Sequence, residues 1–196
     1  MKFRKKKKGT KGYLNSQRKV MLLWTVLLFV MSLGIFLIGY INTGSKENYL
    51  TIIAVLGCLP ASRSLVNTIV LFRYHGISDA DYKKIQPHVK DRMTCCDMVF
   101  TSYEKNYEIH HLAFQKDTLV GYTANPSCDA KACEKHLHEL FAKNDLGEVD
   151  IKIFKDLPKY LNRLDSIALK EEELSENEEA SQKAQSVRAL LCALSL

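Results

Sequence analysis

Two long apolar segments near the start of the chain constrain its fold more than any other feature. Residues 20–41 contain no charged side chain, and residues 49–72 contain only Arg63. At about 1.5 Å per helical residue, each segment can cross the roughly 30 Å apolar core of a bilayer. The polar link between them, residues 42–48, is short, so the second helix must return antiparallel to the first. The sequence predicts a transmembrane hairpin over residues 20–72, with spans 20–41 and 49–72.

The first apolar segment also follows a basic stretch, as the core of a signal peptide does. It is too long for such a core and ends without a small-residue cleavage pattern. We therefore expect an uncleaved anchor.

The distribution of Lys and Arg predicts the orientation of the hairpin. Residues 1–19 carry nine Lys and Arg and no acid, whereas the link carries only Lys46. Because basic loops stay on the cytoplasmic side, both termini of this two-span, multi-pass cell-membrane protein of bacterial type are expected in the cytoplasm. The leader, residues 1–19, serves as a topology signal and is expected to touch anionic lipid headgroups.

The net charge of +6 belongs to this leader. Residues 73–196 carry 17 basic and 21 acidic residues, so the region after the hairpin is mildly acidic. Nucleic acid is therefore not an expected partner.

The second span carries two residues that are unusual in a membrane, Pro60 and Arg63, near its centre. Pro60 frees the carbonyl group of Leu56, and neither span contains an Asp or Glu to pair with Arg63. Three interpretations stay open: Arg63 snorkels from a kinked helix, faces an oligomer or partner, or lines a conduction path. Gly57 and Ala61 form a small-xxx-small pair that suits close helix packing, within one chain or between chains.

Residues 73–169 alternate helical and strand patterns, which predicts a small cytoplasmic α/β domain. Its expected elements are a helix after Ser78 that kinks or ends near Pro87, three strands (97–103, 107–115 and 118–123), a helix capped by Ser127, a strand (149–154) and a helix capped by Asp156. Hairpin-sized links predict that the three strands form an antiparallel meander. The fold class is an α+β membrane protein with a two-helix transmembrane hairpin.

The tail, residues 170–196, differs from the domain in composition. Its first half is strongly acidic and is expected to be a solvated helix or a disordered segment. Its apolar end, residues 187–196, is too short to span a membrane. It is expected to dock on the domain, on a partner or on the membrane surface.

The order helix–strand–strand–strand–helix–strand over residues 79–165 resembles the core of the restriction-endonuclease-like nucleases. That family places an acid on the second strand and an acid-x-Lys pair on the third, to hold Mg²⁺ and orient water. Here the third strand reads Leu119-Val-Gly-Tyr122, without either, and the nearest such side chains are Glu108, Lys116 and Asp117. The resemblance implies a non-catalytic member, or a hydrolase whose catalytic residues have migrated to these three positions.

The second span, which reads LPASRSLVNTIVLFRY over residues 59–74, is similar to small uncharacterised two-span membrane proteins of Gram-positive bacteria. Some of these are labelled O-linked GlcNAc transferase-like. The region after the hairpin has no room for a Rossmann-type sugar-nucleotide domain. A glycosyltransferase activity is therefore not expected.

Cys128, Cys133 and His136 are the candidate metal ligands. Cys133 and His136 are spaced i, i+3 on one helix and can reach one ion, but the spacing from Cys128 is not a common zinc spacing. Cys133 also fits the buried face of that helix. No cofactor is predicted, and in a reducing cytoplasm the six cysteines are not expected to form disulfides.

The sequence favours a membrane-anchored, non-enzymatic scaffold, adaptor or regulatory protein. Its expected partner is another protein or a second copy of the chain. Two alternatives stay open: a membrane-tethered hydrolase of restriction-endonuclease-like fold, and an oligomeric channel or transport accessory that uses Arg63.

Overall fold

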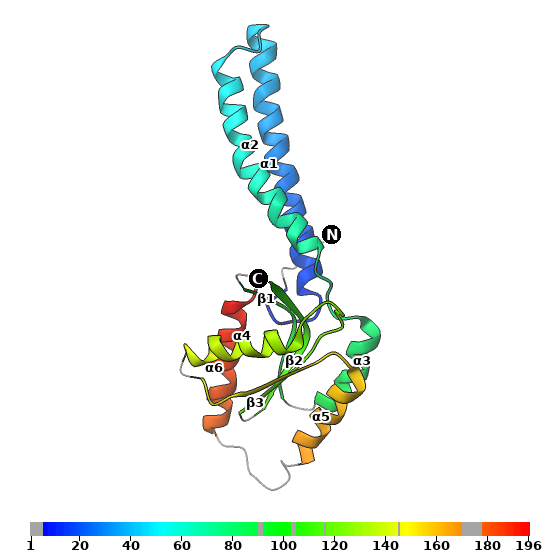
Figure 1. Cartoon of the computed structure of the whole chain (residues 1–196). Coiled ribbons are helices and arrows are strands. Elements are labelled where there is room, and N and C mark those ends of the chain that lie inside the picture. Colours follow the sequence, from blue (N-terminus) through cyan, green and yellow to red (C-terminus); the bar gives the residue numbers. More distant parts are fainter. Residues whose placement is uncertain (1–5, 90–91, 103–104, 116, 145, 170–177) are drawn as a thin grey trace. The chain divides into compact units, whose positions relative to one another are not determined.

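The structure is a computed structural model that describes residues 6–89, 92–102, 105–115, 117–144, 146–169 and 178–196. In this part of the chain it contains six helices and four strands (Figure 1). The contacts divide it into two units. Residues 14–75 form one unit, here called the hairpin, and residues 6–13 together with 76–196 form the other, here called the domain. The described part of the basic leader therefore belongs largely to the domain.

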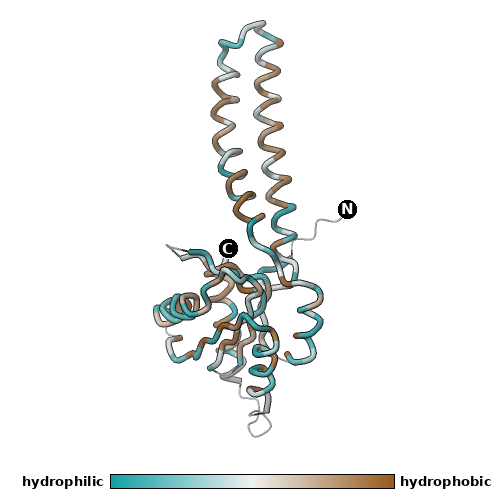
Figure 2. The backbone as a smooth tube through the Cα atoms, turned by 45° about the vertical axis from the view of Figure 1, so that its right-hand side comes forward, coloured by the Kyte–Doolittle hydropathy of each residue, from teal (hydrophilic) through white to brown (hydrophobic). Residues whose placement is uncertain are grey.

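The hairpin consists of α1 (Tyr13–Thr43) and α2 (Tyr49–Phe72), which contain the two predicted spans. Both helices are long and apolar enough to cross a membrane, and apolar residues follow one another along most of each (Figure 2). Asn48 caps α2, because its side chain accepts the backbone N–H of Thr51. The polar residues that precede the first span continue the same helix, so α1 begins at Tyr13.

Small and hydroxyl side chains form the contact between α1 and α2. Ala61 is fully buried, and a Cβ added at Gly57 would lie 3.3 Å from Ser32 Oγ. Thr25 Oγ1 lies 2.7 Å from Ser64 Oγ and 3.1 Å from Thr68 Oγ1. The predicted pair of Gly57 and Ala61 thus packs the two helices of one chain, as small residues do where helices approach closely.

The domain contains the remaining elements. In chain order these are α3 (Asp79–Val89), β1 (Met93–Thr101), β2 (Asn106–Gln115), β3 (Thr118–Tyr122), α4 (Ala130–Ala142), β4 (Asp150–Phe154), α5 (Leu157–Leu169) and α6 (Glu178–Leu194).

The described strands form one sheet in the order β1-β2-β3-β4. β1, β2 and β3 pair antiparallel, which confirms the predicted meander. The sheet has four strands rather than three, because β4 pairs in parallel with β3 after the crossover through α4. Such a crossover is the usual way in which a helix joins two parallel strands.

Helices cover both faces of the sheet. One face, with Leu112, Leu119 and Ile151, packs against Leu137 of α4 and Val187 of α6. The opposite face packs against α3 and α5 through a second apolar cluster. Coverage of both faces explains why successive residues of β1 and β2 are buried, rather than every second one.

One helix boundary differs from its prediction. Asp129, rather than Ser127, caps α4, because its side chain accepts the N–H of Ala132 at 3.2 Å. The N–H of Ser127 is instead donated to Asn125 in the preceding turn. α3 ends at Val89, two residues after Pro87, as the prediction of a helix that ends near Pro87 requires.

The first strand also differs from its prediction, since β1 is Met93–Thr101 rather than 97–103. Its continuation to residue 103 falls on a position outside the described residues. Asp97, which begins the predicted strand, is in the middle of β1 and has a positive φ of 55°.

The apolar end of the tail docks on the domain. Val187 and Leu191 of α6 are fully buried in the same cluster as β1 residues. After α6 the chain continues along β1, where the N–H of Leu196 is donated to the carbonyl group of Val99 at 2.9 Å. Residues 170–177, the core of the predicted acidic segment, lie outside the described residues.

Candidate functional site

Arg63 lies on the exposed side of α2, and its depth follows from the register of the hairpin. Its neighbour Ser64 contacts Thr25, which follows Lys19 by six residues, or about 9 Å along a helix. The end of α2 is fixed in the same way, since Arg18 Nε donates to the carbonyl group of Leu71 at 2.9 Å. At this level Arg63 lies about as far from Lys19 as from the middle of residues 20–41. The three interpretations of Arg63 therefore stay open.

Pro60 lies inside α2, which continues as one helix from Tyr49 to Phe72. The hydroxyl group of Ser62 donates to the carbonyl group of Cys58 at 2.7 Å. This is the kind of local bond by which hydroxyl side chains satisfy carbonyl groups near a membrane proline.

The candidate metal ligands Cys128, Cys133 and His136 do not form a metal site. Both cysteines lie in the apolar cluster under α4, and burial raises the pKa of each thiol. The ring of His136 lies beside the ring of Tyr107, with 5.7 Å between their centroids. In the described part of the chain, no group of three or more His, Cys, Asp or Glu side chains is placed to hold an ion.

The candidate hydrolase residues are not brought together. Glu108 pairs with Val99 near the start of β2, whereas Asp117 follows the last residue of β2. The two acids are therefore at opposite ends of a strand that rises by about 3.4 Å per residue. Asp117 is exposed and forms an ion pair with Lys183. Lys116 lies outside the described residues.

Glu108 instead belongs to a buried polar cluster at the carboxyl end of β3. Asn125 donates from Nδ2 to Glu108 Oε2 at 3.1 Å, and the hydroxyl group of Thr123 donates to the carbonyl group of Glu108 at 2.7 Å. His110 Nδ1 accepts the N–H of Ala124 at 3.1 Å, and its Nε2 lies 4.0 Å from Glu108 Oε1.

These contacts determine what the cluster can do. Because His110 Nδ1 accepts a hydrogen bond, the proton of the neutral ring is on Nε2, which faces the carboxylate. Nδ1 is thus used within the fold, and Nε2 faces the buried carboxylate of Glu108 rather than an open cleft. The cluster connects β2 to the segment that follows β3, which is a structural role.

A second buried carboxylate, Asp97, holds the two places where the chain leaves and re-enters the domain. Its Oδ2 accepts the N–H of Gly12, just before α1, at 2.6 Å. Its Oδ1 accepts the N–H of Ile77, shortly after α2, at 2.8 Å. A Cβ added at Gly76 would lie only 2.9 Å from this carboxylate, so the close approach requires a glycine. We call Asp97 with Gly12, Gly76 and Ile77 the junction site.

The junction site depends on an irregularity in the sheet. Cys95 and Met98 are three residues apart yet lie in the same apolar cluster, as do Ile109 and Leu112 on the adjacent strand. In each strand, two residues instead of one therefore separate these neighbours on the same face of the sheet. The extra residues are Asp97 and His110. The register is unchanged on both sides, and Asp97 is free to turn toward the backbone N–H groups.

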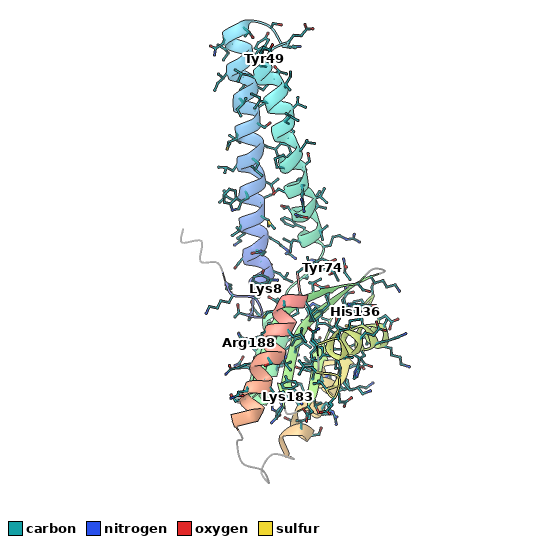
Figure 3. The ribbon with its side chains drawn as sticks, turned by 90° about the vertical axis from the view of Figure 1, so that its left-hand side faces the viewer. Lys8, Tyr49, Tyr74, His136, Lys183 and Arg188 are labelled. Carbon is teal, nitrogen blue, oxygen red and sulfur yellow. The ribbon has the colours of Figure 1, made fainter. Side chains whose placement is uncertain are left out.

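Two leader lysines strengthen the attachment of residues 6–13. Lys8 Nζ donates to the carbonyl groups of Ser195 at 2.8 Å and Cys192 at 3.3 Å, at the C-terminal end of α6 (Figure 3). A cation there is favoured by the carbonyl groups that a helix leaves unpaired. Lys11 forms an ion pair with Asp79, which lowers the pKa of that carboxyl group, and lies over the ring of Tyr82.

Sequence reasoning missed the junction site. The available signals were an isolated acid, Asp97, in an otherwise uncharged strand and two glycines, Gly9 and Gly12, between the leader lysines. No family model matches the chain, and no curated protein or solved structure is similar to it.

Proposed function

We propose that this chain is a membrane-anchored, non-enzymatic adaptor or regulatory protein. The observation that carries the proposal is that residues 6–13 and 76–196 form one domain, with the hairpin inserted between them. One folded domain lies on one side of a membrane, so α1 and α2 cross and return, and both ends of the hairpin are on the side of the domain. The excess of Lys and Arg in the leader makes that side the cytoplasm.

Thiol labelling on intact cells tests this topology. In a background without native cysteines, single cysteines replace Ser45, in the link between α1 and α2, and Ser181, which is exposed on α6. We expect an impermeant thiol reagent to label position 45 on intact cells and position 181 only after lysis. Labelling of position 181 on intact cells would place the domain outside the cytoplasm and overturn the proposed location.

The proposal of binding rather than catalysis is supported by how the polar side chains of the domain are used. Glu108 and His110 bond to neighbouring backbone and side-chain groups, and Asp97 accepts two backbone N–H groups. Catalytic groups need a face directed toward substrate. These side chains are directed at the fold itself, so a partner would bind at the domain surface.

The adaptor role is tested by the location of its partner. Membrane and soluble fractions are compared between cells that contain the chain, cells that lack it and cells in which it has been restored. We expect at least one otherwise soluble protein to leave the membrane fraction when the chain is absent and to return with the restored chain. An unchanged membrane fraction, together with a hydrolytic activity of the purified chain that a metal chelator inhibits, would favour the hydrolase instead.

A further inference from the structure

Three segments that are far apart in the sequence meet beside two cysteines in the domain. Gly9 of the leader lies against Cys95 of β1 and Cys192 of α6, since a Cβ added at Gly9 would be 3.3 Å and 3.6 Å from their sulfur atoms. The carbonyl group of Gly9 also accepts the N–H of Cys96 at 2.9 Å. The thiol groups of Cys95 and Cys192 therefore share one small space under the leader.

The two thiols lie near each other. Both sulfur atoms are within 3.6 Å of one point beside Gly9, and Cys192 Sγ lies 3.9 Å from the carbonyl oxygen of Lys8. Cys95 is fully buried, whereas Cys192 is partly exposed. Cys192 is thus the residue that an oxidant reaches first, and Cys95 is the resolving thiol.

Two cations lie near this pair of cysteines. Arg188, one turn before Cys192 on α6, acts electrostatically on the Cys95 thiol, and Lys8 lies at the C-terminal end of the same helix (Figure 3). Burial outweighs this effect and raises the pKa of Cys95 to about 12, so attack by the Cys95 thiolate accelerates as the pH rises.

We propose that Cys95 and Cys192 are a reversible disulfide site that covalently joins the C-terminal end of α6 to β1. With a small disulfide such as oxidised glutathione as the oxidant, the Cys192 thiolate attacks one sulfur atom and releases one glutathione thiolate. The Cys95 thiolate then attacks the Cys192 sulfur atom of the mixed disulfide and releases the second glutathione. Both cysteine thiols lose their protons, one S–S bond forms in the protein, and one disulfide of the oxidant is reduced to two thiols.

The bond would fix a helix that is otherwise held by non-covalent contacts alone. α6 docks through Val187 and Leu191, and it follows residues that lie outside the described part of the chain. A cross-link between residues 95 and 192 would therefore hold α6 against β1 and enclose the Gly9 segment beneath it. This inference does not depend on the adaptor role or on the side of the membrane that the domain occupies.

Peptide mapping of the purified full-length chain in detergent tests the proposal. The reduced protein is treated with oxidised glutathione over a range of pH, free thiols are alkylated, and the digest is analysed by mass spectrometry. We expect a disulfide-linked pair of peptides that contain Cys95 and Cys192, formed faster at higher pH and removed by a reducing agent. We expect the remaining cysteines to stay free during oxidation and to be found alkylated in the digest: Cys58, Cys96, Cys128 and Cys133.

Cys128 and Cys133, which are both buried, provide the matched control. A Cys128→Ala variant should still form the Cys95–Cys192 bond, whereas a Cys192→Ala variant should not. In the wild type, oxidation should also slow hydrogen exchange in α6, and it should have no such effect in the Cys192→Ala variant. The proposal is overturned if Cys95 and Cys192 remain alkylated after oxidation, if Cys192 stays a mixed disulfide with glutathione, or if Cys95 pairs with a different cysteine.

Discussion

Asp97 shows how one residue can hold together two segments of a domain that are far apart in the sequence. Its carboxylate is buried and accepts the N–H groups of Gly12 and Ile77, which lie on either side of the hairpin in the sequence. Charged acceptors form the stronger hydrogen bonds in proteins, at about 1.5–3 kcal/mol each. The positive φ of Asp97 is the local strain that this arrangement requires.

Asp97→Asn tests this role with almost no change of shape. The amide group keeps one acceptor oxygen and turns an NH₂ donor toward a backbone N–H, so one of the two bonds is lost. We expect the free energy of unfolding of the domain to fall by about 2–4 kcal/mol, measured by denaturant titration of the full chain. Asp79→Asn removes an exposed ion pair with Lys11 and serves as the control, with little expected change. Equal stability of the two variants would contradict the role of the junction site.

Because His111 is buried, we expect the free energy of unfolding of the domain to fall in acid. Its Nδ1 lies 2.7 Å from the hydroxyl group of Tyr160, and burial lowers its pKa from 6.5 to about 4. Between these values the unfolded chain binds a proton that the folded domain does not. The free energy of unfolding should therefore be unaffected by this group above pH 6.5 and fall by about 3 kcal/mol as the pH drops to 4.

The contribution of His111 is isolated by comparison with a His111→Gln variant. The difference in unfolding free energy between wild type and variant should shrink as the pH falls from 7 toward 4. Thermal or denaturant unfolding at several pH values, followed by tyrosine fluorescence, measures it. A difference that stays constant over this range would show that His111 takes up its proton at the same pH in the folded domain as in the unfolded chain.

At the scale of elements, the packing of α1 against α2 makes a prediction that needs no knowledge of function. Ser32 Oγ lies 3.2 Å from the sulfur atom of Cys58. A Ser32→Cys variant should therefore form a disulfide with the native Cys58 under mild oxidation, because the two sulfur atoms would be close enough for one. Protection of both thiols from alkylation, read by mass spectrometry, measures the bond.

The control for this cross-link is Leu33→Cys, one residue further along α1, where the native side chain is exposed. A cysteine there points away from α2 and should stay reduced. Cross-linking at both positions would mean that the two helices slide or rotate against each other.

At the scale of the whole molecule, the leader should contribute to the stability of a domain that lies far from it in the sequence. Gly9 has a φ of 78° and packs against Cys95, so a Gly9→Ala variant is both strained and crowded. We expect it to lower the free energy of unfolding of the domain by about 1–3 kcal/mol, measured by denaturant titration.

Gly44 provides the comparison for Gly9. It also has a positive φ, 61°, but a Cβ there meets no atom within 4 Å, and it lies in the hairpin rather than in the domain. Gly44→Ala should leave the unfolding of the domain unchanged. If both variants unfolded like the wild type, the leader would not be part of the folded domain.

For the whole molecule, the sequence predicted the local elements but not the contacts between distant segments. Apolar runs and turn residues are local signals, so they predicted the two long helices and the meander of β1, β2 and β3. The docking of residues 6–13 depends on partners such as Ser195, which a local pattern does not contain. The basic composition of the leader predicted contacts with anionic lipid headgroups and gave no sign of its contacts with the domain.

The candidate site was predicted less well than the fold. Glu108 was singled out as a possible catalytic acid, but its role follows from Thr123 and Asn125, which the chain brings to it only after β3. From the sequence alone, Asp97 is expected to be an ordinary first residue of the strand 97–103. Its importance arises from the extra residue in each of two paired strands, and that irregularity leaves no mark in a sequence pattern.

The attachment of the leader to the end of α6 has a consequence for biosynthesis. Lys8 leaves the ribosome before the carbonyl group of Ser195 that it contacts, which is 187 positions later. Residues 6–13 are therefore unattached to α6 while the whole of α1 and α2 is being made. Only after α6 has been made can its C-terminal end bind Lys8, so the earliest described segment of the domain is among the last to reach its folded contacts.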